Sequence, residues 1–216
     1  MTTGFKSASI EELIKAATEG NADAQHFLGV RYYYGDGVEE NEEEAFKWYL
    51  KAAEQGHKEA QYQIGDCYYM GDGVEEDKEE ATKWYLKAAE QGHVEAQYQL
   101  GKCYDFDDNN IEAIKWYLKA AEQGHQEAQY QIGEEYYYGW NIEKNEVEAV
   151  KWYRKAAEQG YDLAQYSLGQ CYEKGIGAPK DIDQAKFWYN KAAEQGNTEA
   201  IEALHKYKGF FARLFS

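Results

Sequence analysis

Three cysteines are the best metal ligands and nucleophiles in this sequence, yet their spacing suits neither role. Cys67, Cys103 and Cys171 each follow a glycine by two residues, with no CxxC pair and no histidine nearby. Matching positions on stacked helices lie about 8–10 Å apart, beyond the roughly 7 Å that a disulfide can bridge. We therefore predict three buried free thiols with no metal and no redox role.

Histidines are the next candidates, and they occur at His26, His57, His93, His125 and His205. Three of them directly follow a glycine that ends an alanine-rich segment, so helix capping explains them better than acid–base catalysis. The sequence contains no HExxH, GxSxG or GxxxxGK motif. We predict no catalytic residue, no cofactor and no enzyme activity.

One acidic stretch, residues 105–110 (Asp-Phe-Asp-Asp-Asn-Asn), has the composition of a calcium-binding loop. It lacks the glycine at the sixth place and the glutamate at the twelfth that such a loop needs. We interpret this stretch as a shortened turn, and we expect no metal site.

Acidic residues dominate the composition and give a formal net charge of −17. Nucleic-acid phosphates require a surface of Lys and Arg, so DNA and RNA are excluded as partners. Acids gather at residues 39–44 and 75–80, where they open predicted helices and stabilise the positive helix ends. We interpret these runs as solvated faces, and the net charge favours a basic or neutral protein partner.

A repeated segment positions all of these residues. Lys51–Gly56 (Lys-Ala-Ala-Glu-Gln-Gly) recurs four times, and the Ala-Gln pairs that begin at 24, 60, 96, 128 and 164 are 36, 36, 32 and 36 residues apart. A fixed period in this range indicates a two-helix unit that buries its apolar face by stacking on its neighbours. The sequence therefore predicts one elongated all-α domain.

Each unit is predicted to contain two helices joined by a glycine-rich turn. The first helix carries a core stripe that includes Ala24, Leu28 and Gly29, and the glycine is expected to admit a neighbouring helix backbone. The second helix carries a stripe around Trp48 and Tyr49. In most units the turn uses glycines for positive φ values.

Two turns depart from this pattern. The third turn is four residues shorter than the others. In the fourth turn, Asn141 is expected to replace glycine in a left-handed position.

Two consecutive motifs, A-Q-Y-Q-I-G-D-C-Y-Y-M-G-D-G-V-E-E-D and A-T-K-W-Y-L-K-A-A-E-Q-G, resemble Sel1-like repeats, which are relatives of tetratricopeptide repeats. The resemblance covers about residues 9–207, and its departures are the short third turn and Ile201 in place of glutamine. It implies an all-α, right-handed α/α solenoid of five helix-turn-helix repeats with flanking capping helices. It also implies an adaptor or scaffold whose first helices line a concave face.

The expected boundaries follow from this alignment. They are a flexible N-terminus at 1–8, a capping helix at 9–20, repeats at about 24–59, 60–95, 96–127, 128–163 and 164–199, a closing helix at 199–207 and an amphipathic tail at 208–216.

The inner wall of first helices is the predicted partner-binding site, and its side chains fall into three rows. The rows are His26, Tyr62, Tyr98, Tyr130 and Tyr166; Val30, Asp66, Lys102, Glu134 and Gln170; and Tyr33, Tyr69, Asp105, Tyr137 and Glu173. Tyrosine offers a large, rigid contact area, which suits protein recognition. The nearly uniform first row can equally pack between adjacent repeats. Lys102 is expected to pair with a neighbouring acid, or else to contact a ligand carboxylate.

Both ends of the chain depart from the repeat. Ser9 and Glu12 predict a capping box for a first helix that ends at Gly20. The C-terminal tail carries apolar residues that are expected to cap the last repeat, to dock a partner or another copy, or, least favoured, to contact a membrane surface. These residues are Phe210, Phe211, Leu214 and Phe215.

The predicted function is a non-enzymatic adaptor that captures a protein or peptide in a Tyr-rich, acidic concave groove. The alternatives are an inhibitor or immunity-type protein that neutralises one enzyme, and a structural protein that self-assembles through the tail. Some Sel1-like proteins have been credited with β-lactam hydrolysis, but they carry paired cysteines that this chain lacks, so a hydrolase is a remote alternative. With no apparent signal peptide or membrane span, we expect a cytoplasmic monomer or weak homo-oligomer.

Overall fold

The computed structural model describes Phe5 and residues 8–214, with side chains as far as Tyr207. The chain divides into two compact units, Met1–Asp108 and Asn109–Ser216. Unit 1 contains α1 (Ile10–Thr18), α2 (Ala22–Tyr34), α3 (Glu42–Glu54), α4 (Lys58–Met70), α5 (Lys78–Glu90) and α6 (Val94–Phe106). Unit 2 contains α7 (Asn110–Glu122), α8 (Gln126–Tyr138), α9 (Glu146–Glu158), α10 (Asp162–Lys174), α11 (Ile182–Glu194) and α12 (Thr198–Leu214).

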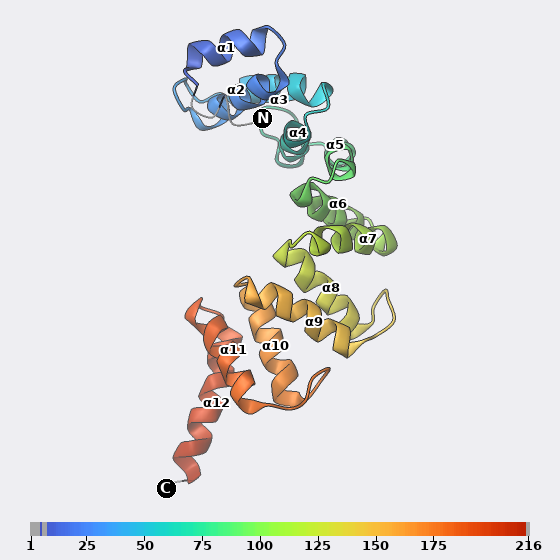
Figure 1. Ribbon diagram of the computed structural model, residues 1–216, viewed down its shortest axis with the longest axis vertical. Coiled ribbons are helices and arrows are strands. Elements are labelled where there is room, and N and C mark those ends of the chain that lie inside the picture. The colour runs from blue at the N-terminus through green and yellow to red at the C-terminus, as the bar shows by residue number, and fades with distance from the viewer. Residues whose placement is uncertain (1–4, 6–7, 215–216) are drawn as a thin grey trace. The chain divides into compact units, whose positions relative to one another are not determined.

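Consecutive helices pack against one another within each unit (Figure 1). No strand is found in the described part of the chain. Each two-helix unit thus buries its apolar face against its sequence neighbours, as the period requires. The prediction of an all-α solenoid is confirmed.

Most helix starts are fixed by side-chain caps, with α7 and α10 as exceptions. The Nδ1 atom of His57 accepts a hydrogen bond of 3.2 Å from the backbone N–H of Ala60, and His93 and His125 cap α6 and α8 in the same way. The prediction that these histidines cap helices is confirmed. The capping box of Ser9 and Glu12 is also present at the start of α1.

The helical glycines Gly29 and Gly65 receive an aromatic ring, which corrects the expectation that they admit a helix backbone. A Cβ added at Gly65 would lie 2.5 Å from the Cδ1 atom of Tyr85. Gly29 meets the ring of Tyr49 in the same way. The first and second helices of a repeat are therefore held together by a buried tyrosine that lies against bare backbone.

A chain of glutamines connects one repeat to the next. The buried Gln61 side chain donates to the Ala53 carbonyl at the end of α3, at 3.1 Å. Its own oxygen accepts from Gln91 Nε2 at 2.7 Å, and the same nitrogen lies 3.1 Å from the Gly56 carbonyl. The Gln61 bond adds a second donor to the Ala53 carbonyl, which also accepts from the Gly56 N–H at 3.0 Å.

The third and fourth turns correct a sequence expectation. Asn141 does not adopt a positive φ; its amide instead contacts the Glu135 carboxylate, with Asn141 Nδ2 3.1 Å from Oε1. Gly139 supplies the left-handed residue of that turn, at φ 72°. In the short third turn, Asp108 takes a positive φ of 57°.

At the C-terminal end, α12 runs without a break from Thr198 to Leu214. The predicted tail contacts Phe210, Phe211, Leu214 and Phe215 lie outside the residues whose side chains are described. Among the described residues, no helix has the length and apolarity needed to cross a membrane. Within the same residues, no His, Cys, Asp and Glu side chains cluster in a way that would hold a metal ion.

Candidate protein-binding site

The first predicted row packs between repeats inside each unit. His26 stacks on His57 with ring centroids 4.7 Å apart, and Tyr62 stacks on His93 at 4.6 Å. The partner in each case is the capping residue of the next repeat. In unit 2, Tyr130 lies near Tyr161 of the next repeat, with centroids 5.4 Å apart, whereas Tyr166 lies near Tyr189 of its own repeat at 5.7 Å. This geometry supports a packing role for the row.

The second row is largely committed to internal hydrogen bonds. The carboxylate of Asp66 accepts from the Tyr85 hydroxyl at 2.7 Å, and Glu134 accepts from the Tyr153 hydroxyl. Burial raises the pKa of both carboxyls. In α10, Gln170 Nε2 and the Tyr166 hydroxyl oxygen lie 2.7 Å apart.

Lys102 differs from the rest of its row, because its side chain is exposed on α6. Its ammonium lies 5.8 Å from the centroid of the Tyr98 ring. Among the described residues of unit 1, it forms no ion pair with Asp66, so the expected salt bridge to that acid is wrong. The Asp66 carboxylate is occupied by Tyr85 instead.

The third row shows three different environments. The Tyr33 hydroxyl donates to Asp72 at 3.0 Å. Tyr137 is half-buried and packs edge-on against Tyr138. Tyr69 is exposed, and its hydroxyl makes no hydrogen bond within the described residues of the chain. Only the last of these tyrosines presents both its ring and its hydroxyl to solvent.

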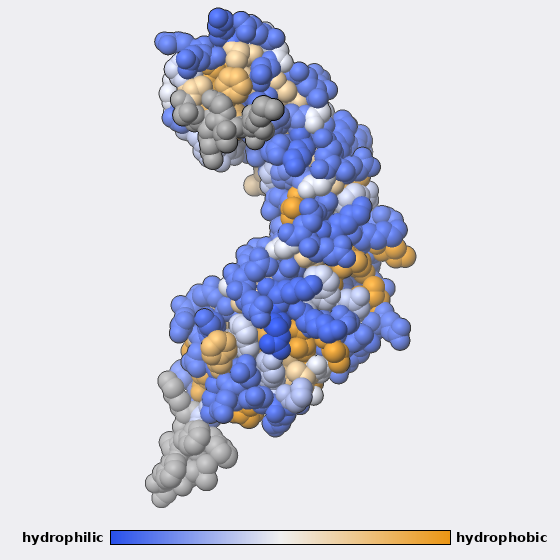
Figure 2. Space-filling model, viewed as in Figure 1, coloured by the Kyte–Doolittle hydropathy of each residue, from blue (hydrophilic) through white to orange (hydrophobic). Residues whose placement is uncertain are grey.

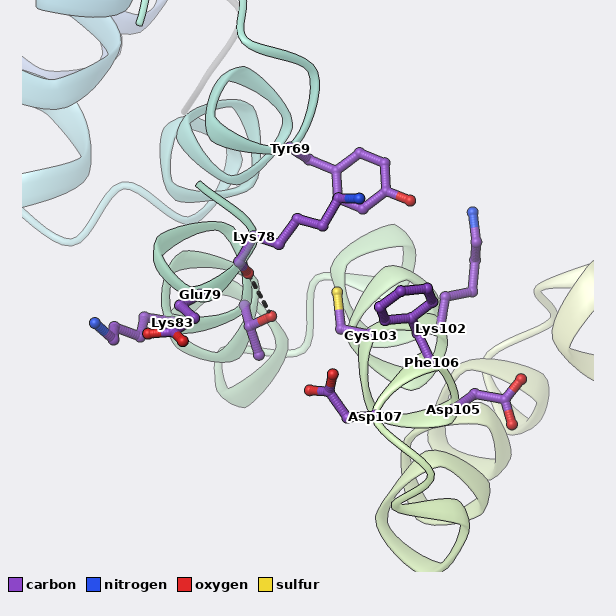
Figure 3. Close-up of a pocket in the computed structure, with 10 residues that line it drawn as sticks. Tyr69, Lys78, Glu79, Lys83, Lys102, Cys103, Asp105, Phe106 and Asp107 are labelled. Carbon is purple, nitrogen blue, oxygen red and sulfur yellow. Dashed lines mark hydrogen bonds between the residues drawn. The ribbon is translucent and has the colours of Figure 1, made fainter. Parts of the chain in front are cut away.

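A pocket of about 610 Å³ lies beside Tyr69, entirely within unit 1 (Figure 3). We call it the α5 pocket. It is lined by Tyr69 of α4, by Lys78, Glu79, Thr82 and Lys83 of α5, and by Lys102, Cys103, Asp105, Phe106 and the adjoining Asp107 at the end of α6.

Figure 3 shows which of these side chains face the cavity. Tyr69, Lys78, Phe106 and the sulfur of Cys103 point toward one another, whereas Glu79 and Asp105 point away. The Lys78 ammonium lies 5.9 Å from the centroid of the Tyr69 ring and 5.6 Å from that of Phe106. The cavity therefore combines aromatic walls with a cation.

Cys103 lies in this cavity, which corrects the expectation of three equally buried thiols. Cys67 and Cys171 are buried, but Cys103 is only half-buried. All three are free, as predicted. Burial raises the pKa of each thiol, and that of Cys67 and Cys171 rises to about 12, so none is a ready nucleophile.

The short third turn explains why the cavity exists. In the preceding repeat, the turn that joins α4 to α5 packs across the start of α3, and Val74 joins the core that contains Cys67. A Cβ added at Gly73 would overlap the Glu42 carbonyl. We call this occupied site the α3 slot. The equivalent turn after α6 lacks four residues, so no turn among the described residues of unit 1 covers the start of α5 in the same way.

Sequence reasoning missed a row of exposed apolar residues at the ends of the first helices. The most exposed is Phe106, which retains 79% of its accessible surface. The row consists of Tyr34, Met70, Phe106 and Tyr138. A signal was present, because the residue that ends the first helix is large and apolar in four of five repeats although it lies outside the predicted core stripe. The visible surface is otherwise mostly hydrophilic, with small apolar patches (Figure 2).

Stacked helix pairs of this kind define a helical-repeat protein of the α/α solenoid class. The Sel1 repeat model matches residues 22–57, 58–93, 94–125, 126–161 and 162–197, and the chain therefore belongs to the Sel1 repeat family. Proteins built from these repeats are generally protein-interaction scaffolds. No curated protein matches the sequence.

Several solved structures are similar to this chain. The protective antigen c5321 of uropathogenic Escherichia coli is 38% identical with a TM-score of 0.85, covering 88% of this chain and 42% of the antigen. A Sel1 repeat protein from Oxalobacter formigenes is 34% identical with a TM-score of 0.82, covering 90% of this chain and 57% of that protein. The chain thus spans about half the length of these two relatives.

The immunity protein Pa5087 of Pseudomonas aeruginosa is more distant. It is 26% identical with a TM-score of 0.51, and the match covers 85% of this chain and 72% of that protein.

Proposed function

We propose that this chain is a non-enzymatic adaptor that binds a segment of a partner protein at the α5 pocket. The observation that carries the proposal is the pair of exposed aromatic residues, Tyr69 and Phe106, beside a cavity of about 610 Å³. Neither ring is needed for the core, and exposed aromatic anchors beside a concavity are the usual source of affinity in protein recognition. The family's role as an interaction scaffold supports the same conclusion.

The contacts described above reduce the number of predicted site residues that can bind a partner. Asp66 and Glu134 serve buried tyrosines and are assigned structural roles, whereas Tyr69 and Lys102 remain contact residues. Tyr137 lies in unit 2 beside the exposed Tyr138, which stacks on Trp140 with centroids 4.5 Å apart. We propose this aromatic patch as a separate contact site of unit 2.

The electrostatic part of the proposal concerns the partner as a whole. A net charge of −17 favours a basic or neutral protein and speeds its encounter at low salt. The three free cysteines favour a reducing compartment, so we place the chain in the cytoplasm.

The test is an affinity capture from cell extract at low and high salt. The Tyr69→Ala/Phe106→Ala variant should lose the captured protein while keeping its helicity by circular dichroism. Ile111→Ala is the matched control, because it removes an apolar side chain that is 68% exposed from a second helix in unit 2. Capture by the double variant at the level of the intact chain would overturn the site.

An inhibitor of immunity type is the second candidate, and the similarity to Pa5087 favours it. Such a protein would capture a single enzyme with very high affinity, whereas an adaptor captures several proteins more weakly. The same experiment separates the two through the number of captured proteins and their resistance to washing.

A further inference from the structure

We propose that the α5 pocket receives an acidic turn of a partner protein, in which a carboxylate is followed by glycine and a small aliphatic residue. This turn would take the place of the one that the third repeat lacks. The inference rests on the proposed function and names the chemistry of the segment that is bound.

The α3 slot shows how such a turn is held. The Asp72 carboxylate accepts a hydrogen bond from the Tyr33 hydroxyl at 3.0 Å. Gly73 lies so close to the Glu42 carbonyl that no larger residue fits. Val74 then packs against the core that contains Cys67. Carboxylate, glycine and aliphatic side chain therefore follow one another in the sequence, and each has its own contact.

Unit 2 repeats the glycine and aliphatic contacts of this arrangement, with Ile176 in the place of Asp72. A Cβ added at Gly177 would overlap the Glu146 carbonyl at the start of α9. The next residue, Ala178, packs against the core that contains Cys171. Docking of a Gly-aliphatic turn on the second helix of the preceding repeat thus occurs independently in both units.

The α5 pocket retains the groups that would receive such a turn. Tyr69 occupies the position of Tyr33, and its hydroxyl has no hydrogen-bond partner among the described residues. Cys103 occupies the position of Cys67, and its sulfur faces the cavity (Figure 3). Thr82 replaces the larger Phe46, which leaves additional room.

The charges that line the pocket determine the charge expected of the bound turn. Glu42 and Asp66 of the α3 slot are replaced in the pocket by Lys78 and Lys102. Both ammonium groups lie at the end of the cavity that also holds Tyr69, while Asp107 lies at the other end (Figure 3). A carboxylate placed beside Tyr69 would meet a hydroxyl donor and two cations, which the α3 slot does not offer. The proposal concerns this one turn and not the net charge of the partner.

Cys103 provides the reporter for the test. The probe is the blocked peptide Gly-Asp-Gly-Val-Glu-Glu, which is the sequence of residues 71–76. Iodoacetamide labelling of each cysteine is followed by mass spectrometry, and buried Cys67 and Cys171 serve as internal controls. The peptide should slow Cys103 alkylation in proportion to its concentration, while the other two rates stay unchanged. Control peptides with Asp→Asn or Val→Ser should protect less.

A turn graft tests the same inference without a free ligand. Replacing Asp107-Asp108 by Gly-Asp-Gly-Val-Glu-Glu restores the missing length, and Cys103 should then react as slowly as Cys67. A graft of equal length with Ser in place of Asp and Val should leave Cys103 reactive. If the graft unfolds the chain, the variant Thr82→Phe replaces it in the test. The new ring fills the cavity from α5 and should slow the alkylation of Cys103.

The outcomes separate the inference from the proposed function. The inference would be supported if the peptide protects Cys103 specifically and if Tyr69→Phe and Lys102→Glu each weaken this protection. Equal protection by all peptides, or none at millimolar concentration, would overturn it even if Tyr69→Ala/Phe106→Ala abolishes capture. Protection by the peptide with unchanged capture by that variant would support the pocket chemistry and overturn the proposed function.

Discussion

The α3 slot and the α5 pocket are the same site in two states, one occupied by the chain itself and one left open. In the first, the turn at residues 71–76 covers the start of α3 and buries Cys67. In the second, a turn four residues shorter leaves Cys103 half-buried and Phe106 exposed. The difference shows that a repeat protein can acquire a cavity by shortening a turn, because the helices on either side keep their own cores.

The occupied site depends most on the absence of a side chain at Gly73. Gly73→Ala should destabilise the protein by about 2–5 kcal/mol, since it adds left-handed strain and an overlap with the Glu42 carbonyl. Urea unfolding measures the loss, and faster alkylation of Cys67 would show that the α3 slot has opened. Gly37→Ala is the control, because Gly37 has a similar φ with open space around it, and it should cost only about 1–2 kcal/mol.

The two equivalent tyrosines should respond differently to loss of the hydroxyl. Tyr33→Phe removes the bond to Asp72 and should cost about 1 kcal/mol, whereas Tyr69→Phe should leave the free energy of unfolding unchanged. Paired urea titrations measure both. A similar loss of stability in both variants would mean that the Tyr69 hydroxyl already has a hydrogen-bond partner. The α5 pocket would then not be the vacant equivalent of the α3 slot.

Filling the pocket should make it resemble the occupied site. Thr82→Phe introduces the residue found at Phe46, and it should stabilise the protein by about 0.5–1 kcal/mol by filling the cavity. Thermal unfolding measures this gain, and slower Cys103 alkylation reports closure. A destabilised variant with an unchanged Cys103 rate would show that the cavity is not the vacant equivalent of the α3 slot.

The smallest expected effect concerns Asp66, whose counterpart in the pocket is Lys102. Burial raises the pKa of Asp66 above its ordinary value of 3.8, and repulsion from Glu95 and Asp72 adds to this, while bonds from Tyr85 and Tyr62 oppose it. The folded state therefore holds this proton more tightly than the unfolded state does. Proton binding to Asp66 therefore raises the free energy of unfolding as the pH falls through the raised pKa. This gain is absent at neutral pH, where the carboxyl is ionised in both states.

Asp66→Asn should abolish that gain. Urea unfolding of parent and variant at neutral pH and just above pH 3.8 measures the difference. The free energy of unfolding of the parent should rise relative to that of the variant as the pH falls. A difference between them that is constant with pH would contradict a raised pKa for Asp66.

Much of the fold followed from the sequence because its causes are local and repeated. Periodicity placed the helix pairs, and the position of His57 after a glycine identified a cap. The prediction for Gly65 was wrong because a backbone position without a side chain can receive either a helix backbone or an aromatic ring. Only the packed structure shows which of the two lies there. The prediction for Asn141 was wrong because its side chain bonds to Glu135, in a turn whose left-handed residue is Gly139.

The candidate site was harder to predict because it arises from something missing. The shortened third turn was recognised, but its consequence depends on what the other turns cover, and this requires the packing of Val74 and Gly73 to be known. Tyr69 and Lys102 were found from the helix wheel. Phe106 was not, since the wheel describes faces along a helix and this residue lies at its end.

The glutamine contacts make each junction between repeats interchangeable. Gln61 bonds the Ala53 carbonyl, and Gln97 bonds the Ala89 carbonyl with the same geometry one repeat later. A chain that lacked residues 58–93 would bring Gln97 to Ala53 and leave no carbonyl without its donor. The number of repeats can therefore change by whole units while every junction keeps the same contacts. This fits the existence of longer relatives, of which the match covers 42% and 57%.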